Sequence, residues 1–158
     1  MKYKLFKFIL AFFLCNFTYS TSEARPPAEN YVIHCSGCHK PNGSGSPSNL
    51  VPDIRNIIGH FTKVSNGREY LIQVADISQA PLQNDEVAAL MNWVLREFSS
   101  LQLTKEFKPY TEEEVKELRE NRPADLHAHR RKLLTSLEGK GIISVSYTHL
   151  RAHETREE

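Results

Sequence analysis

Two cysteines and a histidine lie close together in the run Cys35-Ser36-Gly37-Cys38-His39. Two thiols with a two-residue spacer on a helical turn match the separation of the two vinyl groups of a haem, across which they can add. The imidazole of the next residue can then bind the iron from the same side. This spacing predicts one covalently attached haem c, with thioethers at Cys35 and Cys38 and with His39 as the proximal axial ligand.

Two other kinds of site use similar spacings. A thiol–disulfide oxidoreductase also has two cysteines separated by two residues, but it needs a preceding strand and a βαβ scaffold. The sequence indicates neither. A structural zinc site needs four ligands. The pair His127 and His129 does not complete one, because residues two apart on a helix face different directions. The haem interpretation is therefore favoured.

The elements that position this motif have the pattern of helices. No segment alternates apolar and polar residues as a half-buried strand would, whereas apolar residues recur at helical spacing. Residues 85–98 form the strongest pattern, with acidic residues in the first turn and a continuous apolar face. The predicted fold class is all-α, with helices at residues 28–38, 68–75, 85–98, 111–120 and 124–137.

The first 24 residues have the pattern of a secretory signal peptide. Residues 1–7 carry three lysines, residues 8–14 are apolar but too few to span a bilayer, and Ser22-Glu23-Ala24 is a small-x-small cleavage site. Cleavage after Ser20 and a lipid anchor at Cys15 are alternatives. We expect a mature protein that is periplasmic or secreted and not held in the membrane, which agrees with haem attachment outside the cytoplasm.

The last residues do not read as natural protein sequence. Residues 145–155 resemble the in-frame translation of a transposon-end sequencing adapter. We therefore expect residues 144–158 to be a non-native tail and the native sequence to end near residue 143. On that ground His149 and His153 have no part in the predicted chemistry.

Charge is nearly balanced along the chain. Lysine and arginine number 20 and aspartate and glutamate number 19, which gives a formal net charge of +1 at pH 7. A nucleic-acid partner or a membrane surface would favour a clear basic excess. We therefore expect neither, and any docking on a redox partner must use local patches.

Residues 28–98 resemble the class I cytochromes c. The resemblance rests on a helix that runs into the Cys35–His39 motif, a glycine-rich loop, Pro52 thirteen residues after the histidine, and a closing helix that contains Trp93. It implies that residues 25–103 form one class I cytochrome c-like helical domain around a single haem.

The resemblance also implies particular contacts around the proximal histidine. The backbone carbonyl of Pro52 should accept a hydrogen bond from Nδ1 of His39, which would fix the ring and raise its basicity. The closing helix should cross the first helix. That crossing would place Trp93 or Phe98 against Tyr31 and Val32.

The sixth iron ligand departs from the family pattern. Members of the family usually supply a methionine from the loop before the closing helix, but residues 75–82 contain none. Met91, inside the predicted helix, is the methionine that remains after signal cleavage. Met91 and His60 are therefore alternative sixth ligands. An open or water-bound iron is a further possibility, as is ligation by Asn84 or Lys63.

Axial ligation separates two kinds of function. Two strong ligands keep the iron six-coordinate in both oxidation states and suit electron transfer, whereas an open position suits binding of O₂, NO, CO or peroxide. No other group of residues resembles a catalytic constellation. The sequence therefore predicts an electron carrier, not an enzyme, that relays single electrons between a dehydrogenase and an acceptor. A haem-based small-molecule-binding or peroxidase-like protein is the alternative.

Residues 104–143 extend beyond a minimal domain of this kind. They are predicted to form an additional C-terminal helical hairpin, whose first helix is acidic and opens with a capping box. The second helix is basic at Arg130, Arg131 and Lys132. We expect this hairpin to cover an apolar face of the haem domain. The alternative is that it docks on a dehydrogenase or oxidase partner.

Overall fold

A computed structural model describes residues 24–142, and these residues form α-helices and 3-10 turns but no strand. One isolated bridge joins Ser46 to Val51. The all-α class predicted from the sequence is confirmed. No helix in this part of the chain is long and apolar enough to cross a membrane. The predicted signal peptide, except Ala24, and the predicted tail lie outside the described residues, as does Cys15.

The motif that carries both cysteines lies where two short helices meet. Helix α2 spans Pro27–His34 and helix α3 spans Ser36–His39. Cys35 separates them because its backbone, with φ −124° and ψ −38°, leaves the helical region. The single helix predicted over residues 28–38 is thus two helices, with Cys35 at the break and Cys38 in the second.

A loop and three short helices lead from the motif to the closing helix. The loop contains the 3-10 turn η1, Pro47–Asn49. Helices α4, α5 and α6 follow. Helix α5 ends before the predicted residue 75 because Val74 takes an extended backbone with ψ 144°. The three helices span Ile58–Phe61, Gly67–Gln73 and Ala75–Ser78.

Helix α7, Asn84–Ser99, is the longest helix among the described residues. The backbone N–H of Gln83 donates to the Glu86 carboxylate at 2.9 Å, which closes a capping box at the start of the helix. The apolar face predicted from the sequence is buried. It consists of Val87, Leu90, Met91, Val94 and Phe98.

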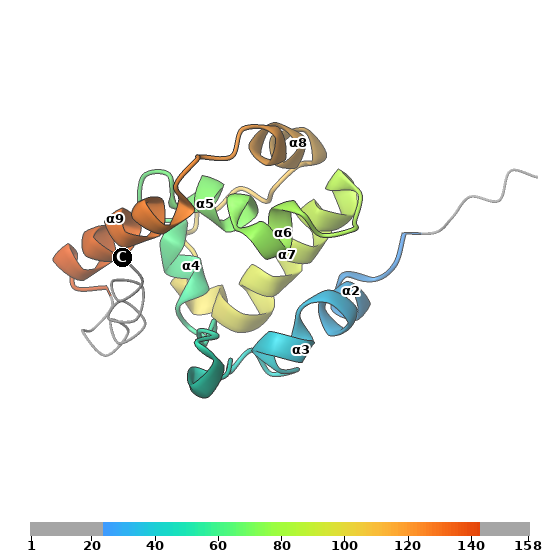
Figure 1. Cartoon of the computed structure of the whole chain (residues 1–158), viewed down its shortest axis with the longest axis horizontal. Helices are drawn as coiled ribbons and strands as arrows, with labels where there is room; N and C mark the ends of the chain where they lie inside the picture. The colour runs from blue at the N-terminus through green and yellow to red at the C-terminus, as the bar shows by residue number, and fades with distance from the viewer. Residues whose placement is uncertain (1–23, 143–158) are drawn as a thin grey trace, which may run out of the picture.

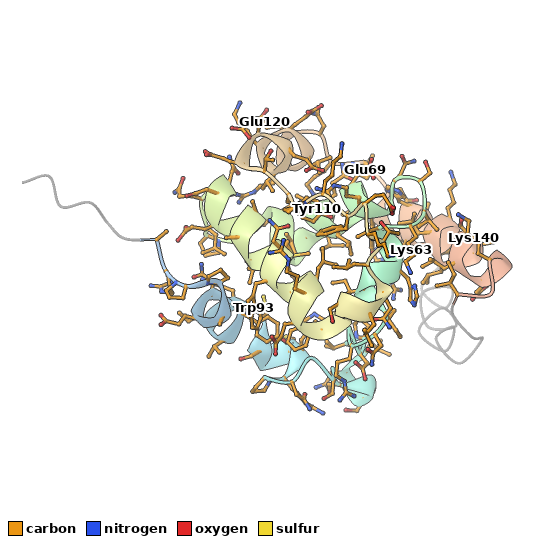
Figure 2. All side chains as sticks on the ribbon, turned by 180° about the vertical axis from the view of Figure 1, so that it is seen from behind. Lys63, Glu69, Trp93, Tyr110, Glu120 and Lys140 are labelled. Carbon is orange, nitrogen blue, oxygen red and sulfur yellow. The ribbon has the colours of Figure 1, made fainter. Side chains whose placement is uncertain are left out.

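An aromatic cluster fastens α2 to α7. The Tyr31 ring lies 5.3 Å from the Trp93 ring and 5.0 Å from the Phe98 ring, centroid to centroid. Figure 2 shows Trp93 at the junction of the two helices. Tyr31 is 1% exposed, but its neighbour Val32 is 59% exposed. Most of the Val32 side chain thus faces solvent, because successive helical residues are rotated by about 100°.

The C-terminal segment wraps around the domain. The 3-10 turn η2, Ser100–Gln102, leads out of α7. Helix α8, Glu112–Glu120, packs on α7 and α5, whereas helix α9, Leu126–Gly139, packs on α5 and α4. Figure 1 accordingly shows α8 and α9 at separate places on the domain. The predicted pair of helices is present, and each helix buries apolar side chains: Val115 of α8 and Leu133, Leu134 and Leu137 of α9.

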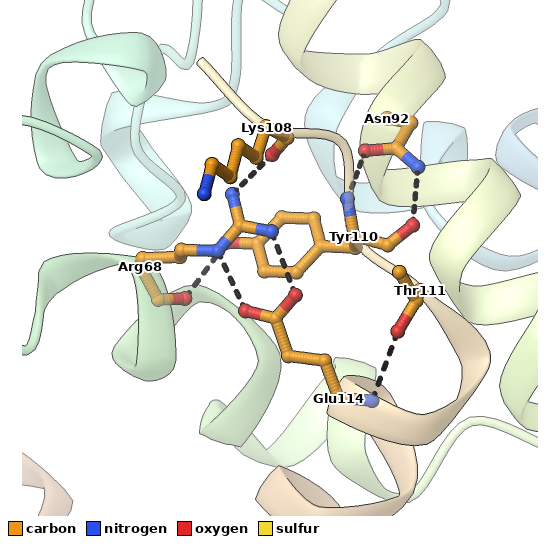
Figure 3. A network of polar contacts seen from close by, with 6 residues as sticks. All are labelled: Arg68, Asn92, Lys108, Tyr110, Thr111 and Glu114. Atoms are coloured by element: carbon orange, nitrogen blue, oxygen red, sulfur yellow. Dashed lines mark hydrogen bonds and ion pairs between the residues drawn. The ribbon is translucent and has the colours of Figure 1, made fainter. Parts of the chain in front are cut away.

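Arg68 connects α5 to the C-terminal segment (Figure 3). Its Nε and Nη2 atoms donate to the two Glu114 carboxylate oxygens at 2.6 and 2.7 Å, and Nη1 donates to the Lys108 carbonyl at 2.6 Å. The guanidinium also lies 3.9 Å from the centroid of the Tyr110 ring. Tyr110 in turn exchanges two hydrogen bonds with the Asn92 side chain of α7. The segment is thereby tied to two helices at once.

Replacing Arg68 with glutamine tests this connection. The variant loses a bidentate, half-buried ion pair and a cation–π contact. We therefore expect its free energy of unfolding, measured by urea denaturation, to be lower than that of the wild type by about 2–3 kcal/mol. The matched control is Lys116→Ala, which removes the exposed Lys116–Glu120 pair at 3.5 Å and should change stability by less than about 0.5 kcal/mol. Equal small effects of both substitutions would contradict the anchoring role of Arg68.

Candidate haem-binding site

A cavity of about 790 Å³ opens between the motif and the rest of the domain. Its size lies within the range of about 300–1,000 Å³ that is usual for ligand and cofactor sites. Cys35 and His39 form one part of its wall, and segments distant in the sequence form the others. The apolar part of the lining consists of Leu50, Pro52, Ile54, Ile58, Phe61, Leu71, Val74, Ile77, Met91 and Val94.

One of the two thiols lies at this cavity. Cys35 lines it and is half-buried, Cys38 is exposed, and no disulfide joins the two. Burial, followed by the charges of Asp76 and Cys38, raises the pKa of Cys35 to about 11. Cys35 is therefore placed to hold a group that fills the cavity, and Cys38 follows it within one helical turn.

His39 is oriented by the loop that follows it. Its Nδ1 lies 3.3 Å from the Pro52 carbonyl oxygen. The loop returns Pro52 to this position because Gly45 adopts φ +65° and its N–H donates to the His39 carbonyl at 3.0 Å. The Ser46–Val51 bridge then closes the loop. With Nδ1 as the donor, Nε2 keeps a free lone pair for a metal.

The imidazole of His39 has the protonation state that a metal ligand requires. Burial lowers its pKa, and the Pro52 hydrogen bond and the charge of Asp76 oppose this shift only in part. The ring is thus neutral at neutral pH, as iron binding demands. A neutral imidazole, two thiols and a large apolar cavity fit a covalently attached haem, with His39 on the iron and Cys35 and Cys38 on the vinyl carbons.

The residues predicted as alternative sixth ligands lie in different surroundings. Met91 lines the cavity and is 2% exposed. His60 is not among the residues that line the cavity, although its neighbours Ile58 and Phe61 are. Burial and the charge of Lys63 lower the pKa of His60. In the part of the chain that the structure describes, its buried Nδ1 has no hydrogen-bond partner.

The other two alternatives lie outside the cavity lining as well. The side-chain oxygen of Asn84 accepts a hydrogen bond from Arg119 Nη1 at 2.9 Å. Neither Asn84 nor Lys63 is among the residues that line the cavity. The sixth ligand thus stays a prediction, and Met91 is the one of the four that shares the cavity with His39.

The sequence did not indicate that the C-terminal helix takes part in the site. Asp125, His127, Arg130 and Arg131 all line the cavity, and Asp76 of α6 lies on another part of its wall. His127 is exposed and lies at the rim of the cavity. The spacing was a usable signal, because residues at i, i+3 and i+4 share one helix face.

The sequence is similar to that of two curated proteins named cytochrome c-552, both from Thermus thermophilus. One is 34% identical over 133 residues, which cover 70% of this chain and 87% of the relative. The other is 34% identical over 122 residues, which cover 63% of this chain and 90% of the relative. No protein-family model matches the chain.

The turn at Gly45 gives a direct test of the Pro52–His39 contact. A Cβ at Gly45 would collide with the Pro52 carbonyl, and its left-handed backbone alone disfavours alanine by roughly 1–2 kcal/mol. Gly45→Ala should therefore lower thermal stability. It should also raise the reduction potential, because a displaced acceptor leaves a less basic imidazole that stabilises ferric iron less.

Gly37→Ala is the matched control for this substitution. A Cβ at Gly37 meets nothing within 4 Å, and the residue lies in the same motif. We expect it to change neither the melting temperature nor the potential appreciably. An unchanged potential in a folded Gly45→Ala holoprotein would show that the loop does not tune His39.

Proposed function

The chain belongs to the c-type cytochromes, and we propose that it works as an exported carrier that relays single electrons between a dehydrogenase and an acceptor protein. Its cofactor is haem c, whose iron supplies a reversible one-electron change. The observation that carries the proposal is the cavity that joins Cys35, His39 and Met91. Apolar walls exclude water from the iron, and fixed ligands change little between oxidation states.

We further propose that Cys35 and Cys38 hold the haem through thioethers and that His39, fixed by Pro52, is its proximal ligand. The position of Cys35 in the cavity wall, the 3.3 Å contact between Nδ1 and the carbonyl, and the lowered pKa of His39 support this assignment. Arg130 and Arg131, on the cavity face of α9, would pair with the carboxylates of the cofactor. Under this proposal residues 25–103 and 104–143 build one site together.

Met91 is the sixth ligand that we propose. It is buried on α7 and lines the cavity, whereas His60 does not. A thioether opposite an imidazole is the ligand pair that raises the potential of a cytochrome. It comes here from a helix instead of from the class I loop, because residues 75–82 contain no methionine.

Substitution of Met91 with leucine tests the proposed ligand while it keeps the side-chain volume. We expect the ferric holoprotein to lose its thioether charge-transfer band and the reduction potential to fall. His60→Gln, the control, should leave both unchanged. The assignment is wrong if His60→Gln alters the spectrum and Met91→Leu does not.

A second candidate function is binding of a small molecule at an open iron. The Asp76 carboxylate on the cavity wall favours it, since a polar group there could orient a bound ligand. This function requires that no side chain occupies the sixth position.

Reversible voltammetry of the holoprotein, together with carbon monoxide binding, decides between the two functions. An electron carrier with two protein ligands should show a one-electron couple with fast electron exchange, and its ferrous spectrum should not respond to carbon monoxide. A shifted Soret band with carbon monoxide, together with high-spin ferric bands, would instead establish the open iron.

Export is proposed on two independent grounds. The pattern of residues 1–24 is that of a signal peptide, and covalent haem attachment takes place outside the cytoplasm. The mature protein would therefore meet its redox partners in the periplasm or outside the cell.

A further inference from the structure

One wall of the haem cavity is formed by a segment with little regular structure. Val74, Asp76 and Ile77 line the cavity, and the chain from there to α7 contains only the four-residue helix α6. Cys35 and His39 line the same cavity, so this wall faces the haem-binding side. Such a short element has few internal contacts to hold its position.

Arg119 of α8 supplies contacts that hold this segment from the outside. Its Nε donates to the Ser78 carbonyl, Nη2 to the Ala80 carbonyl and Nη1 to the Leu82 carbonyl, each at 2.9 Å. Nη1 also donates to the Asn84 side chain at 2.9 Å, at the start of α7. A planar guanidinium can reach such an array of acceptors, whereas a lysine ammonium cannot.

The pattern differs from an ordinary ion pair. Arg68 uses its guanidinium on the Glu114 carboxylate, but these four bonds from Arg119 go to uncharged oxygens of a single segment. The residues beside it extend the contact: Arg122 Nε donates to the Gln73 carbonyl at 3.0 Å. Arg119 and Arg122, at and just after the C-terminal end of α8, thus bind the chain between residues 73 and 84 through hydrogen bonds.

We propose that Arg119 is a positioning residue of the haem pocket, which keeps the α6 wall closed against the haem and thereby limits the access of external ligands to the iron. The proposal rests on the haem lying in this cavity, but not on which proteins exchange electrons with it. Loss of the arginine leaves three carbonyls without their side-chain donor, so the wall opens more often. The haem stays attached through the cysteines.

The test measures the association rate of imidazole with the ferric holoprotein. Arg119→Gln should raise this rate at least about tenfold, because it removes one or more of the four charge-assisted hydrogen bonds of Arg119. The matched control is Asn92→Ala, which removes two hydrogen bonds between α7 and Tyr110 of the C-terminal segment. Asn92 does not line the haem cavity, so its loss should lower the melting temperature without a change in the imidazole rate.

Arg119→Lys separates geometry from charge. It keeps the positive charge but not the fork of donors, so the rate should stay raised if position matters and return to the wild-type value if charge alone matters. A return to the wild-type rate overturns the proposal, as does an Arg119→Gln rate equal to that of Asn92→Ala.

Hydrogen exchange provides a measurement that does not depend on the glutamine variant holding its haem. In Arg119→Lys holoprotein, amides of residues 75–83 should exchange faster than in wild type, while those in the middle of α7 should not. Unchanged protection of the wall segment contradicts the proposal. Failure of the voltammetric test of electron transfer would leave these results standing, so the two failures are distinguishable.

Discussion

An apolar cavity of about 790 Å³ is the constraint on which the rest of the structure depends. Much of its wall is apolar, and apolar surface that faces water costs free energy in proportion to its area. A group that fills the cavity would cover this surface and complete the hydrophobic core. Under the proposal made above, covalent attachment at Cys35 and Cys38 would keep that group in place. The aromatic packing of Tyr31 on α7 fixes the end of the core that carries these thiols.

The walls of the cavity come from chain segments that lie far apart in the sequence. Helices α8 and α9 lie far along the sequence from the motif, yet α9 lines the cavity and α8 holds its α6 wall. Two arginines make this possible in different ways. Arg68 ties the segment to α5 through a carboxylate and two aromatic rings. Arg119 satisfies backbone carbonyls that a short loop cannot pair by itself. The extension thus supplies part of the cavity wall.

The sequence predicted those features that depend on local chemistry. The CxxCH spacing indicated the haem, and helical periodicity indicated the closing helix nearly to its ends, Asn84–Ser99. The sequence did not predict those features that depend on packing between distant segments. The position of His127, Arg130 and Arg131 at the cavity follows from how α9 meets its neighbours. The basic residues of α9 share one helix face, but their spacing does not show what that face covers.

The packing of α2 on α7 also affects how the proposed iron ligands are held. His39 is carried by α3, next to α2, and Met91 is carried by α7, so the separation of the two side chains depends on the contact between α2 and α7. That contact is made by Tyr31, Trp93 and Phe98, whose rings cannot shift without losing area and ring–ring energy. A ligand on such a helix has less freedom to move than one on a loop. If Met91 binds the iron, the aromatic cluster sets the geometry in both oxidation states, and little reorganisation is left to slow electron transfer.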